Sequence, residues 1–146
     1  MATERLNVTQ KDFLNSFKAH YHTYKILPDE EKCVRDKRLI LFYAVECGLK
    51  YWIMKNKSLK DYKELCCYAK REGFRDFGHN IKDMLKDRGM DREYILKDFK
   101  TSEGQRVKPG DMNQFWRYGL QADNLDIENK NVKILNKIAA YLLGRL

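Results

Sequence analysis

Apolar side chains recur every three or four residues along most of the chain, which is the spacing of one helical face. The first such stripe lies between Thr9 and Pro28. Thr9 and Asp12 have the spacing of an approximate capping box, and the residue before a proline avoids the α region. The pattern therefore predicts a first helix that begins at Thr9 and ends before Pro28.

The longest apolar stretch lies between Val34 and Lys55 and predicts a central helix of about 25 residues. Pro28 and the acidic residues that follow it are typical of a helix N-terminus. Because the stretch is apolar over most of its circumference, we expect it to be buried centrally or to pair with a partner. Large rings on this helix exceed what one bundle face needs, so we expect a symmetric homodimer built on it or on the last helix; these rings are Tyr43, Tyr51 and Trp52.

Shorter elements are expected in the second half of the chain. Helices are predicted over 58–73, 79–88 and about 126–146, and 91–99 could also be helical. The stretch 100–110 contains Ser, Gly and Pro and predicts a long exposed loop. We find no convincing alternation of period two. The sequence thus predicts an all-α protein, an up-and-down bundle of about five helices, in a single domain over 1–146 with 1–8 loose.

Composition narrows the class of protein. The chain has 146 residues, a formal charge of +8 and 43% hydrophobic residues, which excludes a disordered basic tail. The longest uncharged apolar runs have seven residues, against roughly 20 for a membrane span. The N-terminus has no apolar core of a signal peptide, so we expect a cytoplasmic protein without membrane association.

The sequence lacks the common motifs that bind a nucleotide cofactor or a metal ion. There is no phosphate-binding glycine loop, no dinucleotide fingerprint and no H-E-x-x-H zinc motif. The four cysteines lack C-x-x-C spacing, and His20 and His22 lie on different sides of the first helix. We therefore expect reduced thiols and no cofactor or metal.

One cluster of candidate chemistry remains, between Lys70 and Asn80. In it, His79 could act as a general acid or base, and Arg75 could stabilise the charge of a phosphorane during RNA cleavage. Lys70, Arg71 and Asn80 are candidates for phosphate binding at the start of the next helix. The alternative is structural: His79 helps to cap that helix while the two phenylalanines of the cluster fill the core.

A second basic and aromatic element covers 115–118. Trp116 and Arg117 could stack on unpaired bases, and Arg106 and Lys108 in the preceding loop could bind phosphates. The alternative is a core tryptophan beside an arginine that reaches solvent.

Three segments resemble the HEPN domain family: Leu41–Lys50 its "A-x-E-x-x-L-K-A" helix, Gly78–Leu85 its "G-H-D-L" segment, and Trp116–Tyr118 its "R-Y" before the last helix. They stand in the right order and span roughly 30–146. The resemblance implies a helical bundle, usually a dimer, from prokaryotic conflict systems. Examples are AbiV-like abortive infection proteins and toxins that pair with a minimal nucleotidyltransferase antitoxin.

Active members of that family cut RNA with an arginine followed, after four to six residues, by a histidine. Here only three residues separate Arg75 from His79. We therefore expect an RNA- or nucleotide-binding module of a defence or toxin–antitoxin system that binds rather than cuts. The alternatives are a metal-independent endoribonuclease that uses Arg75 and His79, and a basic helical adaptor for an acidic protein partner.

Overall fold

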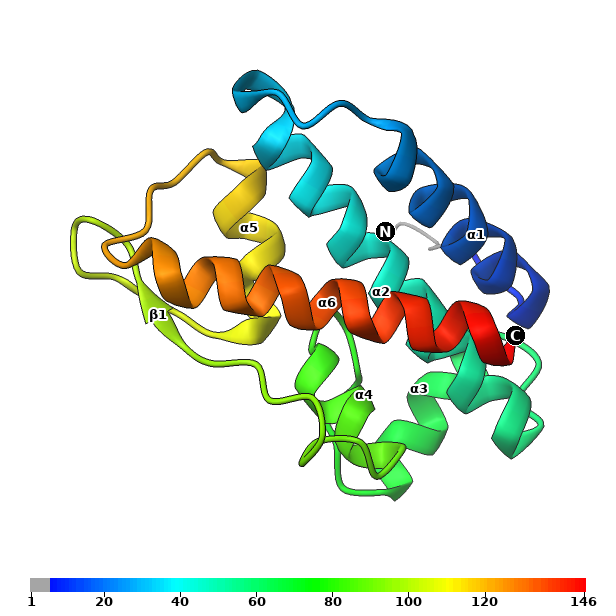
Figure 1. Cartoon of the computed structure of the whole chain (residues 1–146). Coiled ribbons are helices and arrows are strands. Elements are labelled where there is room, and N and C mark those ends of the chain that lie inside the picture. Colours follow the sequence, from blue (N-terminus) through cyan, green and yellow to red (C-terminus); the bar gives the residue numbers. More distant parts are fainter. Residues whose placement is uncertain (1–5) are drawn as a thin grey trace.

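The computed structural model describes residues 6–146. Two long antiparallel helices pack side by side, the first at the edge of the molecule and the second in its middle (Figure 1). Helix α1 spans Gln10–Ile26, and α2 spans Val34–Lys57 after a 3-10 turn at Glu31–Cys33. The predicted capping box is present, since Thr9 and Asp12 exchange hydrogen bonds between side chain and backbone. The middle of α2 is buried, as its apolar circumference predicts: all 11 of its buried residues lie between Leu41 and Met54.

The last helix, α6 (Leu125–Arg145), lies across α2 (Figure 1). The two helices and α1 meet closely at Gly48. A Cβ atom at this position would lie 2.8 Å from Cδ1 of Leu142 in α6 and 2.8 Å from Cδ1 of Phe17 in α1. Glycine therefore allows the three longest helices to share one packed core.

Three shorter helices complete the bundle: α3 (Tyr62–Arg71), α4 (Ile81–Asp87) and α5 (Met112–Arg117). The all-α class is confirmed, with six α-helices within residues 6–146 where the sequence predicted about five. Ser58, the predicted start of the third helix, is instead the left-handed C-cap of α2. Asp61 caps α3 by accepting a hydrogen bond from the backbone N–H of Glu64.

The segment 91–99 is not helical, contrary to expectation. The buried side chain of Asn131 in α6 accepts a hydrogen bond from the N–H of Lys97 at 3.0 Å and donates one to its carbonyl at 2.8 Å. Both backbone groups of Lys97 are thus bonded to a distant helix rather than along the chain. The local pattern of apolar residues does not reveal this hydrogen-bond partner, which competes with helix formation.

The stretch 100–110 is exposed over most of its length, as predicted, but it forms a short β-hairpin followed by a 3-10 turn rather than a loop. Strands β1 (Phe99–Lys100) and β2 (Arg106–Val107) are antiparallel, with Phe99 opposite Val107 and Lys100 opposite Arg106. The side chains of Phe99 and Val107 are buried, so one side of the hairpin belongs to the core. The second 3-10 turn, Pro109–Asp111, leads into α5.

Part of the expected loose N-terminus lies outside the described residues, namely 1–5. Asn7 and Val8 both form hydrogen bonds to the segment that begins α3. The side chain of Asn7 donates to Asp61, and the carbonyl of Val8 accepts from the N–H of Tyr62 at 2.8 Å. The chain that enters α1 is therefore bonded to the start of α3.

Across residues 6–146 the helices are too short or too polar to span a bilayer.

Candidate functional site

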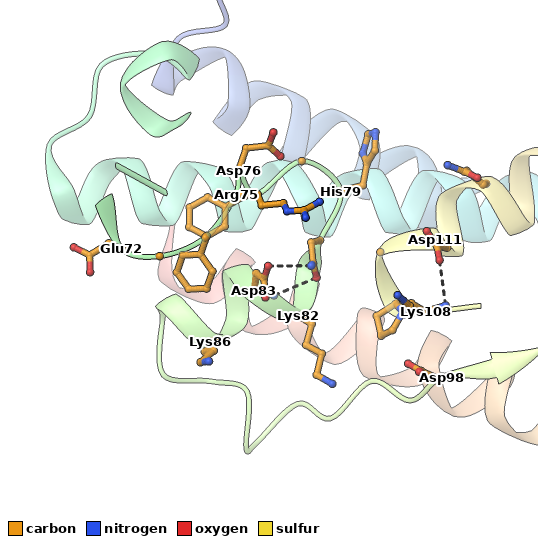
Figure 2. A pocket seen from close by; sticks show the side chains of 18 of the residues that line it. Glu72, Arg75, Asp76, His79, Lys82, Asp83, Lys86, Asp98, Lys108 and Asp111 are labelled. Atoms are coloured by element: carbon orange, nitrogen blue, oxygen red, sulfur yellow. Dashed lines mark hydrogen bonds between the residues drawn. The ribbon is translucent and has the colours of Figure 1, made fainter. Parts of the chain in front are cut away.

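A cleft of about 1070 Å³ separates the segment 72–80 and α4 from the hairpin and its following turn. We call it the His79 cleft, and Figure 2 shows its lining side chains. Arg75, His79, Lys82 and Lys86 line one wall, and Arg106 and Lys108 line the other. Residues far apart in the sequence thus meet here, because the 3-10 turn before α5 lies against Asn80.

His79 is held at one side of this cleft by a buried carboxylate. Its Nδ1 lies 2.6 Å from Oε1 of Glu46, which is 7% exposed in the middle of α2. The side chain of His79 is itself 51% exposed. A carboxylate oxygen carries no hydrogen, so Nδ1 donates to it and the neutral ring leaves Nε2 as the acceptor. His79 is therefore oriented by the core while its other nitrogen is left to solvent or a ligand.

The other oxygen of Glu46 is occupied by Lys50. The ammonium of Lys50 lies 3.0 Å from Oε2, and Lys50 as a whole is 4% exposed. The ammonium is 5.7 Å from the ring centroid of Phe13 and 5.5 Å from that of Tyr62. Burying such a pair costs several kcal/mol per ion, and hydrophobic residues of similar volume are often as stable. Here the buried pair fixes the carboxylate that orients His79.

Arg75 and His79 line the same cleft, but they are not on one helix. Gly78 between them has a φ of +47°, and α4 begins only at Ile81. Among residues 6–146, no hydrogen bond connects the two side chains. The helical i,i+4 arrangement that their spacing would allow is therefore absent.

The capping role belongs to Asn80, not to His79. The Asn80 side chain accepts from the N–H of Asp83 at 3.3 Å and donates to its carboxylate at 3.0 Å. The side chain of His79 therefore does not cap α4. Phe77 is 2% exposed and fills the core as the structural alternative predicts, and Phe74 is half-buried against the core; both also line the cleft.

The other predicted site residues divide into two groups. Arg106 and Lys108 line the His79 cleft, where Arg106 forms an ion pair with Asp98. Lys70 and Arg71 lie in the last turn of α3, outside the cleft. The guanidinium of Arg117 donates a hydrogen bond to the hydroxyl of Tyr43 on α2. Arg117 does not line the His79 cleft either. The predicted basic residues therefore do not all line one cleft.

Trp116 is buried and is not available for stacking on a base. It is 2% exposed, and its Nε1 donates to Oε2 of Glu128 at 3.0 Å. The same oxygen accepts from Arg38, so this carboxylate connects α2, α5 and α6. The structural interpretation of Trp116 is the correct one.

Charges in the His79 cleft are balanced. Five lysines and arginines face five carboxylates in its lining. Three carboxylates are engaged: Asp98 by Arg106, Asp83 by Asn80, and Asp111 by the N–H of Lys108. Within residues 6–146, four of the five cations have no ion-pair partner: Arg75, Lys82, Lys86 and Lys108. The cleft thus offers free positive groups without being a uniformly basic surface.

Sequence reasoning missed Lys82 and Lys86 as cleft residues and Glu46 as the partner of His79. The signal for Glu46 was present: with Lys50 it places two charges four residues apart in a stretch that is otherwise apolar. No group of three or more His, Cys, Asp or Glu side chains in the described part of the chain is arranged to hold a metal ion.

Comparison with protein-family models, with curated proteins and with solved structures gives no match.

Proposed function

We propose that the protein is a HEPN-like RNA-binding module of a prokaryotic defence or toxin–antitoxin system, and that RNA binds in the His79 cleft. One observation carries the proposal: His79, half-exposed in the cleft, is oriented by a carboxylate that is buried with its own counter-ion. The free cations of the cleft would contact phosphates beside it. The two partners come from the two longest segments that resemble the family, Leu41–Lys50 and Gly78–Leu85, which supports the resemblance.

Salt-dependent RNA binding tests this proposal. The affinity of the protein for a short single-stranded RNA can be measured by fluorescence anisotropy. It should fall by about 0.7 log units per log unit of salt concentration for each phosphate contact. The double variant Lys82→Glu/Lys86→Glu should bind much more weakly and with a smaller slope. The matched control is Lys130→Glu/Lys133→Glu, which reverses two exposed charges on α6 outside the cleft. Equal loss in both variants, or no binding by the wild type at low salt, would refute the proposal.

Cleavage is the second candidate function, and the Glu46–His79 hydrogen bond favours it. An oriented histidine with a free Nε2 is suited to take the proton of a ribose 2′-hydroxyl, while Arg75 stabilises the charge that develops on the phosphate. Cleavage by this route persists in EDTA, leaves a cyclic phosphate and is lost in His79→Ala. His22→Ala is the control, because His22 is exposed on α1 outside the cleft. Binding without cleavage would assign the module to recognition alone.

The family resemblance also leads us to propose a homodimer and, as a further partner, a nucleotidyltransferase-type antitoxin. The rings that suggested the dimer have partners within the chain: Tyr51 is 8% exposed, and Trp52 lies against Tyr141 and two arginines. On α6, however, Leu125 and Leu143 are 60% and 42% exposed. Light scattering at tens of micromolar should give a dimer, and Leu125→Glu/Leu143→Glu should give a monomer. A monomeric wild type would exclude the dimer.

A further inference from the structure

An aromatic side chain forms part of the wall of the His79 cleft. Phe74 is half-buried and lines the cleft, whereas its neighbour Phe77 is 2% exposed. The two ring centroids are 5.1 Å apart, with the ring planes inclined by 43°. Phe77 also lines the cleft but is almost fully buried, so the Phe74 ring packs against a core residue and keeps more of its own surface exposed to the cleft.

The backbone around Phe74 is fixed as well. Its N–H donates to the carbonyl of Ala69 at 2.9 Å, and the N–H of Asn80 donates to the carbonyl of Phe77 at 2.7 Å. Gly73 before it has a φ of +88°, a conformation that glycine adopts readily. The ring is therefore held in place before any ligand arrives, which lowers the entropy cost of binding.

Cations without an ion-pair partner in residues 6–146 line the same wall of the cleft as this ring. Arg75 follows it in sequence, and Lys82 and Lys86 are one turn apart on α4, so they lie on the same face of that helix (Figure 2). Aromatic rings bordered by cations are the combination that binds single strands, because bases stack on the ring while phosphates meet the cations. In a duplex the bases are already stacked on one another and cannot reach such a ring.

We propose that Phe74 is a stacking platform for an unpaired base, so that the ligand of the His79 cleft is single-stranded RNA rather than duplex RNA. This inference rests on the proposed function, and it adds the strandedness of the RNA and the residue that selects it. The phosphates next to the stacked base lie along Arg75, Lys82 and Lys86. The stacking contribution of Phe74 does not depend on the base sequence of the RNA, because every base has a π face.

Ring removal tests the platform. Phe74→Leu keeps an apolar contact with Phe77 but removes the π face, and Phe74→Tyr keeps the ring. Affinity for a short single-stranded RNA should fall roughly tenfold in Phe74→Leu, with an unchanged salt slope, and should be retained in Phe74→Tyr. The control is Tyr118→Leu, which removes a ring that is 68% exposed and outside the cleft. Circular dichroism and thermal unfolding confirm that each variant is folded.

A second readout reports the stack directly. An RNA containing 2-aminopurine should lose fluorescence on binding to the wild type and to Phe74→Tyr, but not to Phe74→Leu. The same RNA annealed to its complement should bind at least tenfold more weakly than the single strand.

The outcomes separate this inference from the proposed function. If Phe74→Leu binds and quenches as the wild type does, while Lys82→Glu/Lys86→Glu loses binding, the platform is wrong and RNA binding in the cleft stands. Equal affinity for single strand and duplex also overturns the platform. If the wild type binds an acidic protein but no RNA, both proposals are wrong.

Discussion

Nδ1 of His79 lies 2.6 Å from Oε1 of Glu46, although the two residues are 33 positions apart in the sequence. The contact connects a buried position in the central helix to an exposed side chain in the cleft. Lys50 bonds to the other oxygen of the same carboxylate. His79, Glu46 and Lys50 therefore form a chain of polar contacts that enters the apolar core. The stability of the core and the candidate function of the cleft therefore both depend on Glu46, Lys50 and His79. Substitutions at these positions can separate the effect on stability from the effect on function.

Removing Glu46 alone should be strongly destabilising. In Glu46→Leu the ammonium of Lys50 stays buried without its counter-ion, which costs about 3–5 kcal/mol. The double variant Glu46→Leu/Lys50→Met removes both charges and should recover most of that loss. Urea denaturation of the three proteins measures both differences. A double variant as unstable as the single one would mean that the pair contributes to stability beyond mutual neutralisation.

His79→Ala should cost little stability, because Glu46 keeps Lys50 as a partner. We expect a loss of about 0.5–1.5 kcal/mol, the net value of one hydrogen bond. Asn80→Ala removes the α4 cap and should cost about 0.5–2 kcal/mol while leaving RNA binding less affected than His79→Ala does. Thermal unfolding and anisotropy on both variants test this division of roles. The reverse order in RNA binding would place Asn80, not His79, at the ligand.

Gly48→Ala should destabilise the protein by about 1–3 kcal/mol, since the added methyl group overpacks the contact of α2 with Phe17 and Leu142. Gly144→Ala is the matched control in α6. Nothing lies within 4 Å of its Cβ position, so alanine should stabilise the helix by about 0.5–1 kcal/mol. Denaturation midpoints should therefore move in opposite directions. A shift in the same direction would show that helix propensity, not packing, governs position 48.

Thiol reactivity should differ between Cys47 and Cys67. Burial, followed by the nearby Glu46 charge, raises the pKa of Cys47 to about 12, whereas Cys67 is exposed on α3. Because the thiolate is the nucleophile, Cys47 should stay unreactive at pH 8 and up to about pH 10. Alkylation of the folded protein followed by peptide mass spectrometry should find Cys67 modified first. Early modification of Cys47 would indicate that the core opens around it.

Elements that depend on local pattern were predictable from the sequence. Thr9 and Asp12 form the expected cap, and the long helices follow their apolar stripes, because a cap and a stripe are contained in a few turns. The segment 91–99 was not predictable, since its backbone bonds to Asn131 in α6. The hairpin was missed for a related reason: strands of two residues are too short for an alternating pattern.

The site was predictable only in part. His79 and Arg75 were recognised from their chemistry and do line one cleft. Phe74 and Phe77 are the same residue type three positions apart, and only the three-dimensional fold decides that Phe77 is fully buried while Phe74 stays partly exposed in the cleft. Trp116 was assigned as a candidate for stacking because a sequence does not reveal that Glu128 accepts its N–H.

The double hydrogen bond of Asn131 to Lys97 bears on the order in which the molecule is completed during synthesis. Asn131 lies in α6, whereas the cleft wall with Arg106 and Lys108 follows Lys97 directly and emerges from the ribosome earlier. Until α6 has been made and docked, the backbone at the start of this wall lacks both hydrogen bonds to Asn131. The wall therefore gains this support only once α6 has docked. RNA binding in the cleft would then require a docked α6.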